Sequence, residues 1–379
     1  MTQYLRATRF NILKYIINTC FLKLLIVWSF VYLVQTGIVW SDTPVLRTQT
    51  IPLWKQSIEV IKENAETGDA YAQAVLADRY MNGMGTHLNY EKAAEWAKKS
   101  ADQKNALGAY ILSILYAQGR GVDKNYKKMY ELQKKYLSDI QNLADKGDAL
   151  ALNFYGILYL QGVIFKRSPS KALVIFTKAA SQGYADAGNN IAGIWDSGKE
   201  VGQDYKKAMD WYMKAAVRGH VHAKYNIGIM YKNGQGVNRN PVKAVEWYKK
   251  AAVKGKIPAQ SNLGYMYLTG IGTSKNYQKA LFWHNKAAKK GYAISENSIG
   301  TMFQKGLGVE QDYQKAIIWF KKAANHRNSL ACRNLGIMYE NGWGVQKSCK
   351  IAIEWYKKAS LLGYSKATLY IKDTKLSCR

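Results

Sequence analysis

Ser168 and Lys171 form an S-x-x-K pattern, the spacing used by enzymes that pair a serine nucleophile with a nearby lysine. Neither the K-T-G nor the S-D-N string that accompanies this pattern in penicillin-interacting enzymes occurs in the chain. Two fixed positions also arise easily by chance. We therefore predict that the chain is not an enzyme, and we keep a penicillin-interacting or β-lactamase-like enzyme only as an alternative.

The histidines and paired glycines could in principle hold a metal ion or a phosphate. His220 and His222 have no cysteine or carboxylate beside them at the spacing of a zinc ligand set, so we interpret them as a surface junction between repeats. Glycine pairs such as Gly234 and Gly236 follow helical segments, whereas phosphate-binding loops follow strands. We accordingly predict turn glycines, no metal and no cofactor.

Charge could drive binding on its own. The chain has 55 Lys and Arg against 26 Asp and Glu, a net charge of +29. Such an excess favours anionic partners, but eleven of the lysines recur in two regular series, which indicates a solvated outer face. The first series is Lys178, Lys214, Lys250, Lys286, Lys322 and Lys358, and the second is Lys171, Lys207, Lys243, Lys279 and Lys315. No helix-turn-helix, zinc-finger or RNA-binding aromatic motif accompanies them, so we predict no nucleic-acid binding.

The 36-residue interval that separates these lysines recurs over most of the chain. Five tryptophans stand 36 residues apart, at Trp211, Trp247, Trp283, Trp319 and Trp355. We count eight such units between about Ala70 and Gly363, with an insertion of 7 residues between Gly119 and Gly162. A fixed period of this length is the signature of a repeat array.

The first half of each unit predicts a helix. Ala223, Ile227 and Tyr231 lie on one side of a helical wheel, beside Gly228. Glycine weakens a helix interior, so its recurrence at this position predicts that another backbone packs close by. The helix should end at Gly234, which suits the left-handed conformation of a C-terminal cap.

The second half of each unit predicts another helix. Residues favoured at helix N-termini stand one period apart at Asp204, Asn240, Asn276, Asp312 and Ser348. Ala244, Trp247, Tyr248 and Ala251 then form its apolar stripe. A helical hairpin of this size cannot bury both of its faces, so neighbouring units must stack.

The segment Ala223 to Gly255 resembles a Sel1-like repeat, through Asn226-Ile227-Gly228, Gly234-Gln235-Gly236-Val237, Trp247-Tyr248 and Ala251-Ala252. The resemblance extends over about three-quarters of the chain. It implies a bacterial, tetratricopeptide-like protein with an all-α fold, a right-handed α/α superhelical solenoid of about eight hairpins. It also implies a role in scaffolding and partner recognition.

Residues 1–41 have the layout of an export signal. Arg6, Arg9, Lys14 and Lys23 precede the apolar run Leu24 to Val34, and Val39-Trp40-Ser41 offers a cleavage site. An uncleaved inner-membrane anchor is the alternative, and a cytosolic chain is the remaining option. Both favoured cases place the repeats outside the cytoplasm, periplasmic or secreted. We expect a linker and capping helix over 42–69, repeats over 70–363, and a capping helix and tail over 364–379.

Residues on the first helices that point away from the core should line the inner groove of the solenoid. They vary from unit to unit while the framework repeats, as recognition of one extended ligand requires. The predicted partner-binding residues are Tyr225, Ile229, Lys232, Ser261, Tyr265, Leu268, Asn297, Thr301, Gln304, Arg333, Ile337 and Glu340.

The sequence allows structural predictions for three further sets of residues. The recurring asparagines Asn190, Asn226, Asn262 and Asn334 should hydrogen-bond between adjacent units, with contact to the backbone of a bound peptide as the alternative. The methionines Met230, Met266, Met302 and Met338 should pack between repeats. Cys349 and Cys378 share one side of the array and could form a disulfide, with free or buried thiols as the alternative, whereas Cys332 lies too far from Cys349 to bond.

These patterns predict an exported, non-enzymatic scaffold that binds a protein or extended peptide on its concave face, in envelope biology or host interaction. The alternative is an envelope factor that holds anionic polysaccharide or peptidoglycan through its lysine series. Salt should weaken the second mode far more than the first. The membrane would be contacted only through an uncleaved N-terminal segment.

Overall fold

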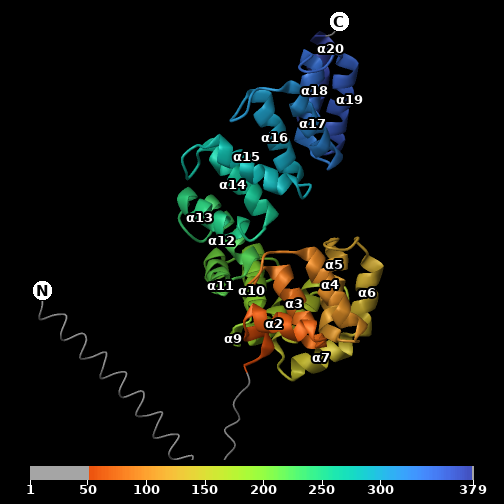
Figure 1. The fold of residues 1–379 in the computed structure, drawn as a ribbon, viewed down its shortest axis with the longest axis vertical. Coiled ribbons are helices and arrows are strands. Elements are labelled where there is room, and N and C mark those ends of the chain that lie inside the picture. Colours follow the sequence, from red (N-terminus) through yellow and green to blue (C-terminus); the bar gives the residue numbers. More distant parts are fainter. Residues whose placement is uncertain (1–50, 378–379) are drawn as a thin grey trace, which may run out of the picture. The chain divides into compact units, whose positions relative to one another are not determined.

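The computed structural model describes residues 51–377, whose regular structure is entirely helical. Figure 1 shows the helices following one another as antiparallel pairs. The elements are η1 (Leu53–Lys55), α2 (Ile58–Glu66), α3 (Ala70–Asn82), α4 (Tyr90–Asp102), α5 (Ala106–Gln118), α6 (Tyr126–Lys135), α7 (Leu137–Asp145), α8 (Ala149–Gln161), α9 (Pro169–Ser181), α10 (Ala185–Ser197), α11 (Tyr205–Val217), α12 (Val221–Asn233), α13 (Pro241–Ala252), α14 (Ile257–Thr269), α15 (Tyr277–Ala288), α16 (Ala293–Lys305), α17 (Tyr313–Asn325), α18 (Ser329–Asn341), α19 (Cys349–Leu361) and α20 (Ala367–Ser377).

These helices form eight hairpins. Hairpins 1 and 2 are α3–α4 and α5–α6, and hairpins 3 to 8 run in order from α8–α9 to α18–α19. The predicted export segment, residues 1–41, lies outside the described residues. In residues 51–377, every helix is too short or too polar to cross a lipid bilayer.

The helix ends follow the expected chemistry. The N–H of Gly234, which has φ +77°, donates to the carbonyl of Met230 and closes α12. At the start of α13, the side chain of Asn240 accepts a hydrogen bond of 3.0 Å from the backbone N–H of Lys243. The same cap begins α9, where Ser168 accepts from the N–H of Lys171. The S-x-x-K pattern therefore has a structural explanation in a helix N-terminus.

The mid-helix glycine faces an aromatic ring. A Cβ atom added at Gly228 would lie 2.6 Å from the ring of Tyr248 in α13, and one added at Gly300 would lie equally close to Phe320. The prediction of a neighbouring backbone was wrong for Gly228, whereas at Gly300 the added atom would also lie 3.2 Å from the backbone carbonyl oxygen of Ala316. The missing side chain makes room for a ring of the second helix, which is buried as a result.

The second glycine of each turn has a packing role. A Cβ atom at Gly236 would collide with the backbone carbonyl of Tyr205, at the start of α11 in the preceding hairpin. Gly272 meets the backbone of Pro241 in the same way. These glycines let one hairpin approach the next, in addition to letting the chain turn.

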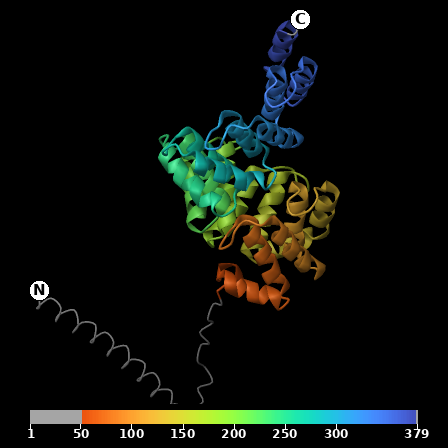
Figure 2. The same ribbon diagram turned by 45° about the horizontal axis from the view of Figure 1, so that its top comes forward.

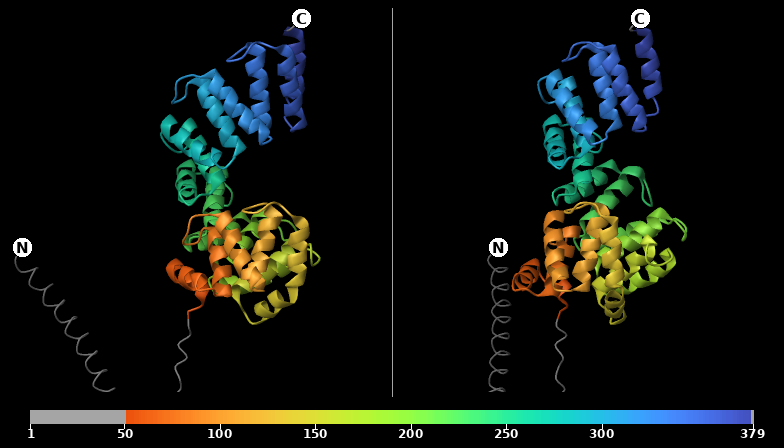
Figure 3. Two further views of the ribbon diagram at one scale, coloured as in Figure 1. Left: turned by 45° about the vertical axis from the view of Figure 1, so that its right-hand side comes forward. Right: turned by 90° about the vertical axis from the view of Figure 1, so that its right-hand side faces the viewer.

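Contacts between adjacent hairpins confirm the asparagine prediction at two of its four positions, and the methionines are buried as expected. Asn190 donates 2.9 Å to the Oδ1 of Asn153, and Asn334 donates 2.9 Å to the Oδ1 of Asn297. The four recurring methionines are all buried. Figure 3 shows the last hairpins, in blue, packed side by side.

The insertion and the cysteines complete the array. The added residues form α7, which follows α6 directly at Tyr136 and packs on α8. Cys332 is buried with a free thiol, as expected, and Cys349 is disulfide-bonded. Its predicted partner, Cys378, lies outside the described residues.

Candidate functional site

Ten of the eleven lysines in the two series lie on aromatic rings. In the first, the Nζ of Lys250 is 4.1 Å from the ring centroid of Trp247, in the same helix. In the second, Lys243 lies 5.4 Å from the ring of Tyr231, which belongs to the first helix of the hairpin. The contact recurs at Lys214, Lys286, Lys322 and Lys358 and at Lys171, Lys207, Lys279 and Lys315. These ammonium groups stay exposed, so each cation–π contact is worth about 0.5–1 kcal/mol.

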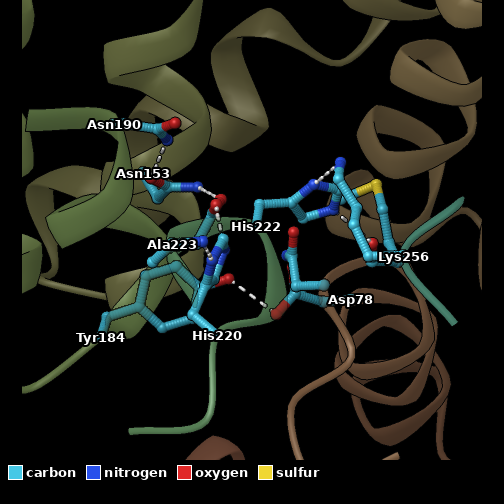
Figure 4. Close-up of polar contacts among 11 residues, drawn as sticks. Asp78, Asn153, Tyr184, Asn190, His220, His222, Ala223 and Lys256 are labelled. Carbon is cyan, nitrogen blue, oxygen red and sulfur yellow. Dashed lines mark hydrogen bonds and ion pairs between the residues drawn. The ribbon is translucent and has the colours of Figure 1, made fainter. Parts of the chain in front are cut away.

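The first hairpins meet again across a buried polar junction, which Figure 4 shows in close-up. The hydroxyl of Tyr184 donates 2.8 Å to Asp78 in α3, and Asn82 donates 2.8 Å to the other oxygen of the same carboxylate. Burial and the nearby charge of Asp186 raise the pKa of Asp78 to about 7. This pair brings hairpin 1 against the start of hairpin 4.

Asp186 connects three hairpins at this junction. It accepts 2.6 Å from the amide of Asn153 in α8, and its second oxygen lies 3.1 Å from the Nε2 of His220 (Figure 4). The Nδ1 of His220 accepts from the N–H of Ala223, which leaves the proton on Nε2 to donate to Asp186. His220 is fully buried, so its interpretation as part of a surface junction was wrong.

His222 and Lys256 continue the junction back to hairpin 1. The Nε2 of His222 lies 3.3 Å from the carbonyl of Met81, and its Nδ1 lies 2.6 Å from the Nζ of Lys256. Burial lowers the pKa of His222 well below its usual value, and burial lowers the pKa of Lys256 to about 8. A neutral imidazole therefore donates to Met81 and accepts from the lysine. Among residues 51–377, no group of three potential metal ligands occurs.

Two cavities lie on the first helices. One, of about 340 Å³, adjoins the junction and is lined by residues of hairpins 1 to 5, including His222 and the predicted groove residue Tyr225. The other, of about 540 Å³, lies at hairpins 5 and 6 and is lined by the predicted residues Lys232 and Tyr265. Sequence reasoning missed six further residues that line the second cavity and gave Asn262 a partner contact only as an alternative; the missed residues are Asn233, Arg239, Pro241, Tyr248, Met266 and Ile271. Arg239, Pro241 and Ile271 lie at hairpin turns, whereas Tyr248 and Met266 are buried residues of α13 and α14.

Several predicted groove residues contact the array itself. Arg333 donates 2.8 Å to the hydroxyl of Tyr370 in α20, and Glu340 accepts from Tyr356 and Thr374. Asn297 accepts from Asn334, as described above, and Ser261 is buried. The remaining predicted residues, Ile229, Leu268, Thr301, Gln304 and Ile337, are half-buried along α12 to α18. Partner binding by the twelve residues stays a prediction.

The hairpin geometry and its glycine, tryptophan and cap positions agree with the comparisons. The family model "Sel1 repeat" matches residues 70–105, 106–128, 149–184, 189–220, 221–255, 257–292, 293–328 and 329–364. The chain therefore belongs to the Sel1-repeat family. Proteins of this family are generally protein-interaction scaffolds, typically without enzymatic activity.

Solved structures show the same fold. The chain is 31% identical to c5321, a protective antigen of uropathogenic Escherichia coli, with a TM-score of 0.56, over 83% of this chain and 66% of that one. It therefore spans just under two thirds of that antigen. A Sel1 repeat protein from Oxalobacter formigenes is 24% identical, with a TM-score of 0.55, over 89% of this chain and 98% of that one. No curated protein gives a significant match.

Proposed function

We propose that this chain is an exported scaffold that binds an extended segment of a partner protein along the first helices of hairpins 5 to 7. The cavity of about 540 Å³ at hairpins 5 and 6 is the observation that carries the proposal. Two apolar side chains of this cavity are unusually accessible, since Tyr265 is 47% and Ile271 is 39% exposed. Exposed aromatic and aliphatic groups beside a cavity are typical of surfaces that bind protein.

The other hairpins offer less free surface on their first helices. In hairpins 1 to 4, Asp78, Asp186 and the side chains around them are already bonded across the polar junction. In hairpin 8, Arg333 and Glu340 bind the capping helix α20. In hairpins 5 and 6, by contrast, the predicted groove residues Lys232 and Tyr265 are exposed.

Pull-down of partners from the native cells tests this assignment. The double variant Ile229→Ala with Tyr265→Ala should lose captured proteins, because it removes apolar contact area from the groove. The matched control is Ile318→Ala, which removes an aliphatic side chain that is 53% exposed on the second helix α17. If the groove variant retains every protein that the control retains, the groove assignment is wrong.

Export is the second half of the proposal. It rests on the basic residues Arg6 to Lys23 followed by the apolar run Leu24 to Val34. Alkaline phosphatase fused after the last repeat should be active in a bacterial host, since it folds only outside the cytoplasm. The mass of the mature chain separates a cleaved signal from a retained anchor. An inactive phosphatase, with the fusion intact, would contradict export.

Binding of an anionic envelope polymer is a second candidate function. It is favoured by the two lysine series, whose ammonium groups stay exposed beside aromatic rings. Sedimentation with purified peptidoglycan should then fall steeply as salt rises from about 0.05 to 0.5 M. Binding that persists through that range would point to the groove instead of the lysines.

A further inference from the structure

A tyrosine of the second helix and an acidic residue of the first helix form a recurring pair. In hairpin 4, the hydroxyl of Tyr212 donates 3.4 Å to Asp196. In hairpin 8, the hydroxyl of Tyr356 donates 2.6 Å to Glu340. Both pairs occupy the same two positions of the repeat, 16 residues apart. The carboxylate satisfies a hydroxyl that the hairpin would otherwise bury alone.

Hairpin 5 keeps the tyrosine and lacks the acid. Tyr248 stands at the position of Tyr212 and Tyr356, and Lys232 stands where the sister hairpins carry Asp196 and Glu340. The side chain of Tyr248 is 0% exposed, and its hydroxyl makes no hydrogen bond of normal geometry within residues 51–377. Burial raises the pKa of Tyr248, and the amide of Asn262 beside the hydroxyl acts as a donor, so the hydroxyl keeps its proton and that proton still lacks an acceptor within the described residues.

A cavity of about 540 Å³ lies at this tyrosine. Two cations, Lys232 and Arg239, line it, and its lining contains no acidic residue. Pro241, Met266 and Ile271 form its apolar part. A buried donor, two positive groups and a missing carboxylate all favour the same ligand atom, a negatively charged oxygen.

We infer that this cavity binds the side chain of an acidic residue in the partner segment, with an apolar neighbour against Met266 and Ile271. The ligand carboxylate takes the role that Asp196 and Glu340 have in the sister hairpins and accepts from Tyr248. A side chain is favoured over a chain end because predicted groove residues continue on both sides of the cavity, at Ile229 and at Thr301. This inference rests on the proposed function and specifies the chemistry of its ligand.

Peptide binding to the full-length chain, followed by the ¹³C-methyl signals of its methionines, tests the inference. The probe is acetyl-Gly-Ser-Leu-Glu-Leu-Ser-Gly-amide, compared with its Gln counterpart and with a peptide ending in a free Leu carboxylate. The Met266 signal, assigned through Met266→Leu, should shift with the Glu peptide. The Gln peptide should bind about tenfold more weakly, because the charged hydrogen bonds are lost.

Variants of the pair give opposite effects on binding and stability. Tyr248→Phe should weaken the Glu peptide about tenfold without lowering the melting temperature, since the hydroxyl makes no hydrogen bond of normal geometry within the array. Lys232→Glu restores the acid of the sister hairpins, and it should abolish binding while raising the melting temperature. The matched control Tyr356→Phe should lower the melting temperature and leave peptide binding unchanged, because its hydroxyl is already paired.

Three results would overturn the inference. They are equal affinity for the Glu and Gln peptides, no shift of Met266 up to about 10 mM peptide, and a preference for the free chain end. Partner capture separates this failure from that of the proposed function. If Lys232→Glu keeps a partner that Ile229→Ala with Tyr265→Ala loses, the groove binds without the acidic contact.

Discussion

Hairpins 1 to 5 and hairpins 7 to 8 share one repeat but differ in the contacts that they make. In the first group, residues more than a hundred positions apart meet, as Tyr184 and Asp78 do, and the backbone N–H of Leu88 donates 2.9 Å to the carbonyl of Lys254. In the second group, pairs such as Asn334 with Asn297 join adjacent hairpins. Figure 2 shows the first hairpins, orange to green, gathered together and the blue hairpins following in a row.

The difference indicates that a few buried polar residues can couple hairpins that are not neighbours in a repeat array. An array with contacts only between neighbours has a stability close to the sum of its units and interfaces. The junction around Asp186 adds contacts that skip several units, so hairpins 1 to 5 should open together. Hairpins 7 and 8 should open independently of hairpin 1.

The largest expected effect comes from removing the centre of the junction. His220→Ala should cost about 4 kcal/mol, because it removes a helix cap, a buried hydrogen bond to Asp186 and well-packed atoms. Asn328→Ala, at the same repeat position in hairpin 8, removes only the cap of α18 and should cost about 1 kcal/mol.

Hydrogen exchange separates the two regions in this pair of variants. His220→Ala should speed exchange in α3, which lies far away in sequence, as well as in α10 and α12. Asn328→Ala should speed exchange only in α18 and its neighbours. Unchanged protection of α3 in His220→Ala would show that the first hairpins do not behave as one unit.

Low pH should lower the folding stability through a buried histidine outside the junction, His284. His284 stands at the repeat position that Tyr248 holds in hairpin 5 and Phe320 holds in hairpin 7. Its side chain is fully buried, and burial lowers its pKa to about 4. The unfolded chain takes up this proton near pH 6.5, whereas the folded chain does so only near pH 4, so stability falls as the pH drops through that window.

His284→Phe, which copies Phe320 of hairpin 7, should remove this dependence. The gain should reach about 3 kcal/mol at pH 4, relative to the gain at pH 7.5. Urea unfolding at the two pH values measures it, with Phe282→Leu on the exposed face of α15 as the control. An equal difference between variant and parent at both pH values would contradict the assignment.

A smaller effect concerns the first-helix glycine that lies against the buried ring of the second helix. Hairpin 7 pairs Gly300 with Phe320, whereas the equivalent positions of hairpin 1 hold Ala77 and Ala97. Gly300→Ala should cost about 1 kcal/mol, since overpacking outweighs the gain in helix propensity.

A double-mutant cycle checks the cause. In a Phe320→Ala background, the same glycine substitution should be neutral or stabilising, giving a coupling of about 1–2 kcal/mol. Additive costs would mean that the glycine is needed for another reason than the ring.

The smallest expected effect lies on the outer face. Lys322→Ala removes the ammonium group that lies 4.4 Å from the ring of Trp319, and should cost about 0.5 kcal/mol. Lys321→Ala is the control, because its neighbourhood in the described part of the chain includes no cation–π contact. Thermal unfolding in low and in high salt measures the stability lost in each variant. Equal losses in the two variants would mean that the contact with the ring of Trp319 contributes nothing.

The fold was predictable because its signals are local and repeated. Caps such as Asn240 and Gly234 act on the nearest backbone groups, and the apolar stripe of Ala244 to Ala251 follows helical periodicity. The candidate site was predictable only in part. Lys232 and Tyr265 were found from the helical wheel, whereas Arg239 and Tyr248 were missed because they belong to a turn and to the core.

The sequence alone determined that the chain folds as stacked helical hairpins, since capping, periodicity and the glycine positions depend on neighbours along the chain. Only the tertiary structure decided that His220 is buried, that Asp186 connects three hairpins, and that Tyr248 lacks the acid which Tyr356 has. The reason is physical. The free energy of a buried polar group depends on which partner lies within about 3 Å of it. For residues separated by many repeats, that partner is set by how the hairpins wind and not by their periodicity.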